Sequence, residues 1–227
     1  MYSIVIPVYN EEESLPVLVD EIRAAMAPLM ADYEIIIVDD GSTDKSPEIL
    51  AGLGQRMPAS LKIITTKQTG QTHAMRKGIE ASKGRWVITM DADLQNDPSD
   101  IPWLIAKMKE GGLDCVCGWR KNRKDSFLKA FMSKGANFVQ RLLTGCPVHD
   151  ISCTLRIYTK ACALAVPLNW KGQHRFIALC AAMQGYRIGE VEANHRPRRF
   201  GRSKYSHKRV FRVVMDFFKI LSTRGRR

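Results

Sequence analysis

Runs of consecutive apolar residues alternate with stretches of helical periodicity along the first half of the chain. The apolar runs are continuous, which favours parallel strands that are buried on both faces. They cover residues 3–8, 34–38 and 86–90. Helical patterns cover residues 12–27, 44–53, 70–81 and 98–108. This order predicts an α/β fold in which a mostly parallel sheet is flanked by helices.

The second half of the chain is less regular but contains two amphipathic helical patterns, over residues 128–143 and 206–221. In the second pattern the charged residues fall within an arc of about 100°; they are Lys208, Arg209, Arg212, Asp216 and Lys219. Apolar residues fill the rest of that helix surface. Such a helix either lies in a membrane interface or packs on its own domain, and the sequence leaves both interpretations open.

Positive charge is concentrated at the C-terminal end of the chain. The net charge is +12, and residues 195–227 contain twelve lysines or arginines against a single acid, Asp216. A basic block of this kind favours an anionic partner such as a lipid surface. A nucleic acid is less favoured, because the basic face lacks interleaved aromatic residues and no RNA- or DNA-binding module is recognisable.

The length of 227 residues suits one domain with a full core. We expect residues 1–200 to form that domain and residues 201–227 to add a basic amphipathic C-terminal segment to the same unit, at a membrane interface. No apolar run approaches the ~20 residues that span a bilayer. The chain enters a strand at once without a basic leader, so no signal peptide is expected.

The six cysteines include no Cys-x-x-Cys pair. Cys115 and Cys117 fall in a strand-like segment, residues 113–117, where alternation places both side chains on one face. Buried free thiols in a reducing compartment are therefore expected.

Polar residues follow each of the three apolar runs; they are Tyr9, Glu11, Asp39, Asp40, Asp91 and Asp93. Ligands of open α/β sheets bind beyond the carboxyl ends of the strands. Two carboxylates one residue apart, Asp91 and Asp93, are placed to share one hard cation such as Mg²⁺ or Mn²⁺. The alternative is that these acids are turn residues and helix caps, roles that suit Asp44 and Asp97 well.

Three of these segments resemble family 2 glycosyltransferases of the GT-A (Rossmann-like) fold: Ile-Pro-Val-Tyr-Asn-Glu-Glu at 6–12, Val-Asp-Asp-Gly-Ser-Thr-Asp at 38–44 and Asp-Ala-Asp-Leu-Gln at 91–95. Later segments, at 118–120, 150–156 and 198–205, resemble the polyprenyl-phosphate glycosyltransferases within that family, which include the dolichyl-phosphate mannose synthases. The motifs occur in the family's order and span nearly the whole chain.

The resemblance implies an enzyme that transfers a sugar, with inversion, from a nucleotide sugar to a polyprenyl phosphate, dolichyl or undecaprenyl. GDP-mannose is the first expected donor and a UDP-hexose the next. The implied cofactor is Mg²⁺ or Mn²⁺. The implied location is cytoplasmic and peripheral, on the cytoplasmic face of an anionic membrane surface, and a membrane-spanning partner is left open.

The resemblance also assigns roles to individual residues. Those implied to be catalytic are Asp91, Asp93 and Arg120. The implied metal ligands are Asp91, Asp93 and Gln95. The implied contacts to the nucleotide sugar are Pro7, Tyr9, Glu11, Val38, Asp39, Asp40, Asp91, Ala92, Asp93, Arg120, Arg198 and Lys204. The implied contacts to the lipid phosphate are Arg120, Lys134, Arg156 and Arg198.

Acids are scarce between Arg120 and Asn194; they are Asp125, Asp150, Glu190 and Glu192. Neither the Glu-Asp pair nor the Gln-x-x-Arg-Trp motif of saccharide-transferring relatives is present. A lipid phosphate is already ionised near neutral pH and needs no strong base, so this scarcity favours a phosphate acceptor. The alternatives are a family 2 glycosyltransferase with a saccharide acceptor and, from another class, a basic nucleic-acid-binding protein.

Overall fold

The computed structural model describes residues 1–121, 141, 144–200 and 208–223. It contains a seven-stranded sheet with the order β3-β2-β1-β4-β6-β5-β7. The strands are β1 (Tyr2–Val8), β2 (Tyr33–Asp39), β3 (Leu61–Thr65), β4 (Trp86–Thr89), β5 (Cys115–Trp119), β6 (Arg156–Thr159) and β7 (Ile188–Glu192). Within this sheet β6 alone runs antiparallel to its neighbours, so the predicted mostly parallel sheet is confirmed.

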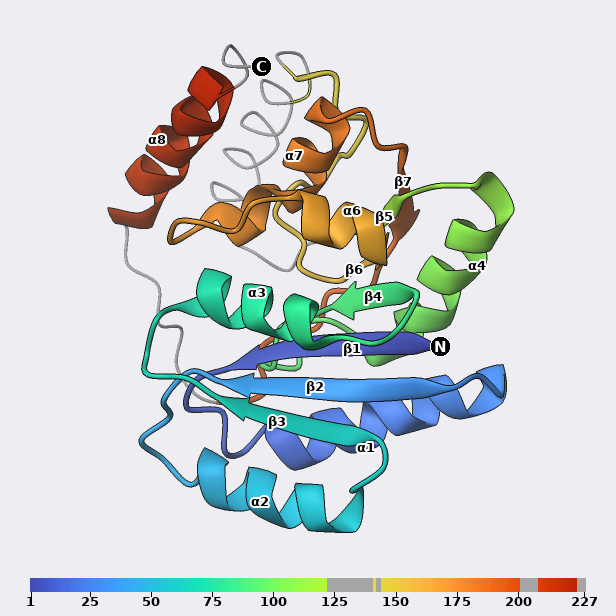
Figure 1. Ribbon diagram of the computed structural model, residues 1–227, viewed down its shortest axis with the longest axis vertical. Coiled ribbons are helices and arrows are strands. Elements are labelled where there is room, and N and C mark those ends of the chain that lie inside the picture. The colour runs from blue at the N-terminus through green and yellow to red at the C-terminus, as the bar shows by residue number, and fades with distance from the viewer. Residues whose placement is uncertain (122–140, 142–143, 201–207, 224–227) are drawn as a thin grey trace.

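Helices cover both faces of the sheet (Figure 1). On one face lie α1 (Leu15–Met26), α2 (Ser46–Arg56) and α4 (Ile101–Gly111). On the other lie α3 (Gln71–Ala81), α6 (Lys160–Ala165), α7 (Ile177–Met183) and α8 (Lys208–Thr223). Short 3-10 helices are η1 (Ala27–Leu29), η2 (Pro98–Asp100) and η3 (Gln173–Phe176).

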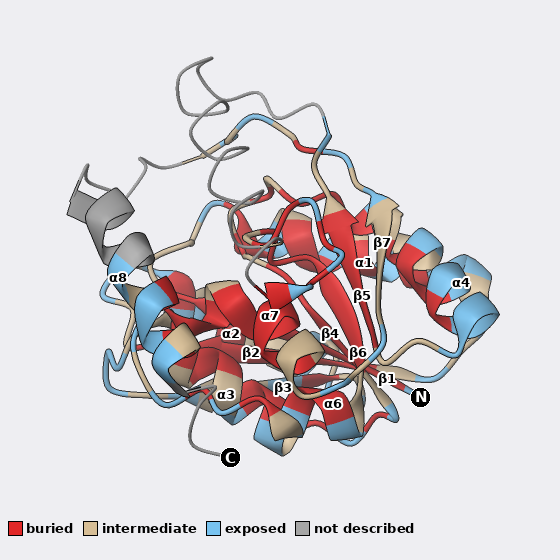
Figure 2. Cartoon of the chain, turned by 90° about the horizontal axis from the view of Figure 1, so that it is seen from above, coloured by how far each residue is buried: buried red, intermediate tan, exposed pale blue. Residues whose placement is uncertain are grey.

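Burial on both faces explains why the central strands are continuously apolar. In β1, Ile4 and Ile6 belong to the core cluster beneath α1, while Val5 belongs to the cluster beneath α3. In β2, Ile37 and Ile36 divide between the same two clusters. Figure 2 shows the strands as a buried centre, with exposed residues on the outer sides of helices and in loops.

The strands β1, β2 and β4 confirm the predicted apolar runs, whereas β3, β6 and β7 are not among the strands that the sequence predicts. β6 has four residues, and β7 is a partly exposed edge strand of five residues, so neither carries a long apolar run. All six cysteines are buried free thiols, and the Sγ atoms of Cys115 and Cys117 lie 3.8 Å apart on one face, as expected. The helix predicted over residues 128–143 lies almost entirely outside the described residues.

α8 confirms the predicted C-terminal amphipathic helix and packs on its own domain along one side. Phe217 and Ile220 are buried, and the Phe217 ring lies 6.5 Å from that of Phe176. Met215 and Phe218, in contrast, are 53% and 58% exposed. In the part of the chain that the structure describes, no helix combines the length and the apolar character that a membrane crossing requires.

Close packing of α3 on the sheet leads to a stability prediction. A Cβ atom at Gly78 would lie 2.3 Å from Cγ1 of Val5 and 3.2 Å from Cγ2 of Val38. Because both neighbours are core side chains, we expect Gly78→Ala to lower the free energy of unfolding by about 1–3 kcal/mol, measured by urea denaturation. Gly52→Ala is the matched control: it lies within α2 with nothing within 4 Å of a Cβ, and it should stabilise by roughly 0.5–1 kcal/mol. Equal effects of the two substitutions would contradict this packing.

Candidate active site

The carboxyl ends of β1, β2 and β4 lie at the same edge of the sheet, toward the left in Figure 1. The strands are in register, with Val8 beside Asp39 and Val5 beside Thr89. Parallel pairing therefore brings the polar segments that follow the three strands to one edge.

Asp91 and Asp93, which follow β4, have different partners. Oδ1 of Asp91 accepts a hydrogen bond of 2.7 Å from Nε2 of Gln71, the first residue of α3. Oδ1 of Asp93 accepts from the backbone N–H of Gln95 at 3.2 Å, and its Oδ2 pairs with Nη2 of Arg198. Burial and then the charge of Asp93 raise the pKa of Asp91 to about 6. Asp93 thus has an ion pair with Arg198, whereas Asp91 has none within the described residues.

Arg198 brings positive charge from the far end of the chain to this edge. Its Nη2 contacts Asp93, and its Nη1 lies 3.9 Å from Oε1 of Glu11, which follows β1. The predicted residues Glu11, Asp93 and Arg198 are therefore close together in space. Ala92, between the two acids, is buried.

Asp40 is buried and organises the loop that precedes α3. Its carboxylate accepts hydrogen bonds from the backbone N–H groups of Thr69 (2.7 Å) and Gly70 (2.6 Å) and from the hydroxyls of Thr66 (2.7 Å) and Thr69 (3.0 Å). Four such bonds nearly fill the acceptor capacity of a carboxylate. Asp40 therefore shapes the loop, and this placement does not support its predicted direct contact with the nucleotide.

Asp39 is also buried, and its Oδ1 accepts the backbone N–H of Ser42 at 3.0 Å. Gly41 lies between them with φ at +74°, and a Cβ there would meet the backbone N of Gln68 at 2.9 Å. The tight turn after β2 thus depends on glycine. Oδ2 of Asp39 makes no hydrogen bond within the described residues, so it is the acceptor that this turn leaves for a ligand.

Of the other residues predicted to contact the nucleotide, Tyr9 lies at this edge, whereas Pro7 and Val38 are buried. The Tyr9 hydroxyl accepts a hydrogen bond of 2.7 Å from Nε2 of Gln68 at this edge. Pro7 and Val38 are neighbours across β1 and β2, but both are buried. The Val38 side chain packs in the core beneath α3, so a contact of this side chain with the nucleotide is not supported.

Backbone strain gathers in the same loops. Among the described non-glycine residues, φ is positive at Asn10 (52°), Gln68 (40°) and Leu94 (60°), which follow β1, precede α3 and follow Asp93, and also at Met30 (46°), which follows η1. Such conformations are costly for most residues and persist where surrounding contacts enforce them. Their concentration beside the acids is consistent with a functional edge.

Arg120 directly follows β5 and is clamped by Asp150. Nε and Nη2 donate to the two oxygens of Asp150 at 2.7 and 3.0 Å, and Nη2 also donates to the Ser152 hydroxyl at 3.1 Å. Burial lowers the pKa of Arg120, but Cys153 and the Asp150 carboxylate raise it, and the net direction is upward. The guanidinium therefore stays charged.

Arg156 has a different role from the one predicted. It is fully buried, and it donates to the carbonyl oxygens of Ile151 (2.6 Å), His174 (3.1 Å) and Arg175 (3.2 Å). Because these bonds lie inside the core, contact between Arg156 and an acceptor phosphate is not supported. Its role is corrected to that of an internal cation that joins two loops.

Three predicted residues remain without a described side-chain contact to the acids. The carbonyl oxygen of Gln95 accepts from the backbone N–H of Arg196 at 3.0 Å, but its side chain has no described partner. Lys134 and Lys204 lie outside the described residues. Within the described ranges, no group of three or more His, Cys, Asp or Glu side chains is arranged to hold a metal. A Mg²⁺ ion typically uses one or two carboxylates and substrate phosphates, so the pair Asp91 and Asp93 fits that chemistry.

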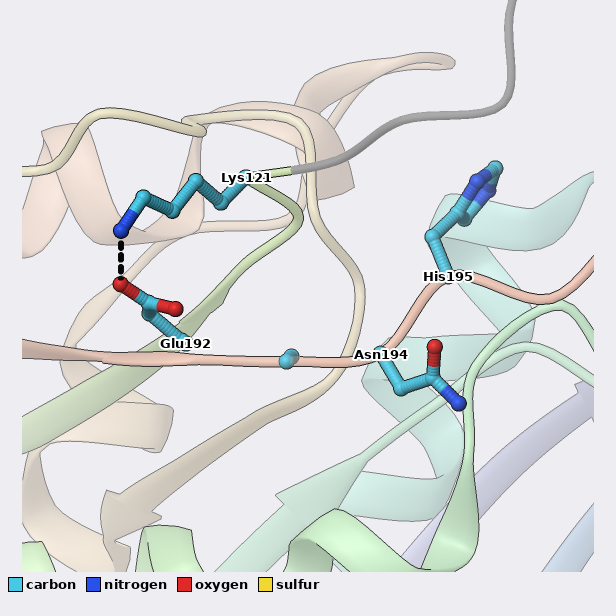
Figure 3. A pocket seen from close by; sticks show the side chains of 5 residues that line it. Lys121, Glu192, Asn194 and His195 are labelled. Atoms are coloured by element: carbon cyan, nitrogen blue, oxygen red, sulfur yellow. Dashed lines mark hydrogen bonds and ion pairs between the residues drawn. The ribbon is translucent and has the colours of Figure 1, made fainter.

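A pocket of about 230 Å³ lies beside the end of β7 and is lined by Lys121, Glu192, Ala193, Asn194 and His195 (Figure 3). Nζ of Lys121 and Oε1 of Glu192 pair at 2.6 Å. Because this lining contains none of the acids that follow β1, β2 and β4, we do not assign the predicted nucleotide to this pocket.

Gln71, Asp150 and Glu190 are site neighbours that sequence reasoning did not assign. Gln71 had no signal, because a glutamine at the start of a helix is unremarkable on its own. Asp150 is part of the segment that carried the family resemblance, but its pairing with Arg120 depends on the fold. Glu190 accepts the backbone N–H of Asp150 at 3.1 Å, and nothing in the sequence indicates that contact.

Comparisons with known proteins agree with this architecture. The chain is 40% identical over 223 residues to dodecaprenyl-phosphate galacturonate synthase of Rhizobium johnstonii, covering 96% of this chain and 66% of that one. It is 39% identical over 223 residues to undecaprenyl-phosphate 4-deoxy-4-formamido-L-arabinose transferase of Serratia proteamaculans, covering 97% and 68%. The chain thus spans about two thirds of the length of these relatives.

The fold matches glucosyl-3-phosphoglycerate synthase of Mycobacterium tuberculosis in complex with Mn²⁺ and UDP-glucose, with a TM-score of 0.71 at 17% identity over 99% of this chain and 78% of that one. At that identity the likeness shows the fold alone. The family described as "Glycosyl transferase family 2" matches residues 3–163. With that match over most of its length and with relatives of this identity, the chain belongs to glycosyl transferase family 2.

Proposed function

We propose that the protein transfers a sugar from a nucleotide sugar to a polyprenyl phosphate and inverts the anomeric centre. The observation that carries this proposal is that Asp91, bonded to Gln71, and Asp93, paired with Arg198, lie at one sheet edge. The names of the relatives, which specify dodecaprenyl- and undecaprenyl-phosphate, support a lipid phosphate as the acceptor.

The acids of the edge divide into two roles in this proposal. Asp91 and Asp93, with Gln95 beside them, would hold Mg²⁺ or Mn²⁺, which when bound would supply positive charge opposite the leaving diphosphate. Gln71 orients Asp91 through its hydrogen bond. Oδ2 of Asp39 and the ring of Tyr9 receive the nucleoside, while Glu11 lies between the nucleoside and Arg198.

The contacts of the acids between Arg120 and Asn194 support an acceptor that is already negatively charged. Among the described acids between Arg120 and Asn194, Asp150 pairs with Arg120, Glu190 accepts two backbone N–H groups, and Glu192 pairs with Lys121. Each of them is engaged in holding another group. A phosphate needs no deprotonation near neutral pH, whereas a sugar hydroxyl does. Arg120, together with Arg198 and the undescribed Lys134 and Lys204, binds the phosphates in this proposal.

The identity of the donor sugar is the most specific part of the proposal. The names of these two relatives specify galacturonate and 4-deoxy-4-formamido-L-arabinose. Neither name specifies mannose, so GDP-mannose is no longer the first expected donor. We therefore test UDP-linked sugars alongside GDP-mannose and place neither first.

We place the protein at the periphery of an anionic membrane, on its cytoplasmic face, and α8 supports the membrane contact. Its inner side is buried by Phe217 and Ile220, which leaves Met215 and Phe218 exposed on the outer side. Exposed apolar side chains beside basic residues suit the headgroup region of a bilayer. The lipid tail of the acceptor would remain in that bilayer while its phosphate reaches Arg120.

The reaction is tested by incubating the protein with Mg²⁺ or Mn²⁺, undecaprenyl phosphate and a panel of radiolabelled UDP- and GDP-sugars. We expect label from one donor to enter the organic phase and to be lost with EDTA. Asp93→Ala should reduce kcat/KM by a factor on the order of 10²–10³, because it removes a group that acts on developing charge. Label transferred to a glycan and not to the lipid would contradict the proposed acceptor.

The raised pKa of Asp91 predicts a pH dependence of stability in the metal-free protein. Because its pKa is about 6 in the folded state and 3.8 is the ordinary value, ionisation of Asp91 opposes folding as the pH rises from about 4 to about 6. Asp91→Asn should therefore gain stability relative to the parent protein over that range and keep a constant advantage above it. Urea unfolding at pH 4.5, 5.5 and 7 checks this, and a stability difference that does not change with pH would refute it.

The outer side of α8 should contribute to membrane binding. Replacing Met215 and Phe218 by Ser should weaken sedimentation with vesicles of anionic lipid at least tenfold, because each fully buried apolar side chain contributes roughly 1.5–3 kcal/mol. Met30→Ser is the matched control, because Met30 is 96% exposed and lies outside α8. Loss of binding in the control, or full binding by the α8 variant, would contradict this role.

A further inference from the structure

We propose that Glu190 is a positioning residue that holds Arg120 ready for a phosphate. The inference rests on the proposed function, because it assigns Arg120 to the phosphates. Glu190 itself touches neither substrate in this proposal. It acts through the loop formed by residues 148–152.

The Glu190 carboxylate grips this loop at three points. Oε1 accepts the backbone N–H groups of His149 at 2.8 Å and Asp150 at 3.1 Å. Oε2 lies 2.7 Å from Nδ1 of His149, and because a carboxylate only accepts, this ring nitrogen is the donor. The Glu190 side chain is 12% exposed and that of His149 is 45% exposed, so the bond to the Asp150 N–H is the best shielded of the three.

The loop in turn contacts Trp119, the last residue of β5, and Arg120, which follows it. The His149 ring stacks on the Trp119 ring, with centroids 4.5 Å apart and planes at 20°. The Asp150 carboxylate forks onto Nε and Nη2 of Arg120. The Glu190 carboxylate, through its bonds to backbone N–H groups, therefore fixes His149 and Asp150, which contact Trp119 and Arg120.

The fork leaves a defined part of Arg120 for a ligand. Nε and Nη2 point at Asp150, and Nη1 makes no hydrogen bond within the described residues. A guanidinium held on one edge presents its remaining N–H groups in a fixed direction, which suits recognition of phosphate oxygens. If the loop shifted, Arg120 would keep its charge but lose that direction.

The topology explains why β7 carries this residue. Glu190 is the register partner of Cys117 on β5, two residues before Trp119. β7 thus runs parallel to the strand that delivers Arg120 and places one carboxylate beside the loop that must hold it. Glu192, two residues further along β7, instead pairs with Lys121 at the surface.

The test combines a double-mutant cycle with a direct view of Arg120. Transfer rates, the Kd of the nucleotide sugar and Tm are measured for Glu190→Ala, Glu190→Gln and Arg120→Ala, alone and combined. The ¹⁵N-labelled protein reports the Arg120 Nε–H resonance, which is assigned by its loss in Arg120→Lys. Glu192→Ala is the matched control, because it removes an exposed ion pair from the same strand.

We expect Glu190→Ala to lower kcat/KM for the lipid phosphate by about 10- to 100-fold, the range for residues that orient a functional group. The Kd of the nucleotide sugar should stay nearly constant. In the Arg120→Ala background the same substitution should have almost no further effect, because coupled residues are not additive. Glu190→Gln should recover part of the rate, because its amide oxygen still accepts backbone N–H groups, and Glu192→Ala should match the parent.

The Arg120 Nε–H resonance should be protected from exchange in the parent and in Glu192→Ala, and should lose protection in Glu190→Ala. Equal losses of rate in both backgrounds, or protection that survives in Glu190→Ala and Glu190→Gln, would overturn the proposal. The resonance needs no substrate. An absence of transfer by the parent would therefore refute the proposed function, while the resonance still decides whether Glu190 holds Arg120.

Discussion

Negative charge gathered at the carboxyl edge of the sheet is the constraint on which the rest of this structure depends. Carboxylates that are partly removed from water require donors or cations close by. Asp40 is satisfied by the loop before α3, and Asp93 by Arg198. Asp91 accepts a hydrogen bond from Gln71, makes no ion pair within the described residues, and has a raised pKa. The edge therefore retains a demand for positive charge at Asp91, which is the property that a divalent-cation site needs.

The chain meets part of this demand by returning to the edge after β7. Arg196 forks onto Asp97 at 2.6 and 3.0 Å, and its backbone N–H donates to the carbonyl of Gln95 at 3.0 Å. Nδ2 of Asn194 donates to Asp97 at 2.9 Å. These bonds fasten the segment beside the Asp-x-Asp sequence and so bring Arg198 to Asp93. The basic end of the sequence and the acidic strand ends are thus parts of one electrostatic arrangement.

The sequence predicts the strands β1, β2 and β4 and the acids behind them, because two-sided burial requires continuous apolar runs and parallel strands end at a common edge. Arg120 and Arg198 are indicated only by resemblance to a family. The contacts of Gln71, Asp150 and Glu190 are not predictable in this way, because each joins segments that meet only after the sheet has formed. For Arg156 the motif predicts a contact with the lipid phosphate, and this prediction is not supported. The side chain lies in the core, where its bonds to carbonyl oxygens decide its role.

The contacts of the acids Asp150, Glu190 and Glu192 follow from the same electrostatics. Asp150 directs Arg120, Glu190 directs Asp150, and Glu192 holds Lys121, so the described carboxylates there act on cations and backbone amides. A general base needs an acid that faces the substrate and whose pKa suits proton transfer. An anionic acceptor removes that requirement and replaces it with a need for directed positive charge. In the proposed roles, Arg120 supplies this directed charge and Glu190 on β7 holds its orientation, and this arrangement favours a phosphate acceptor over a sugar hydroxyl.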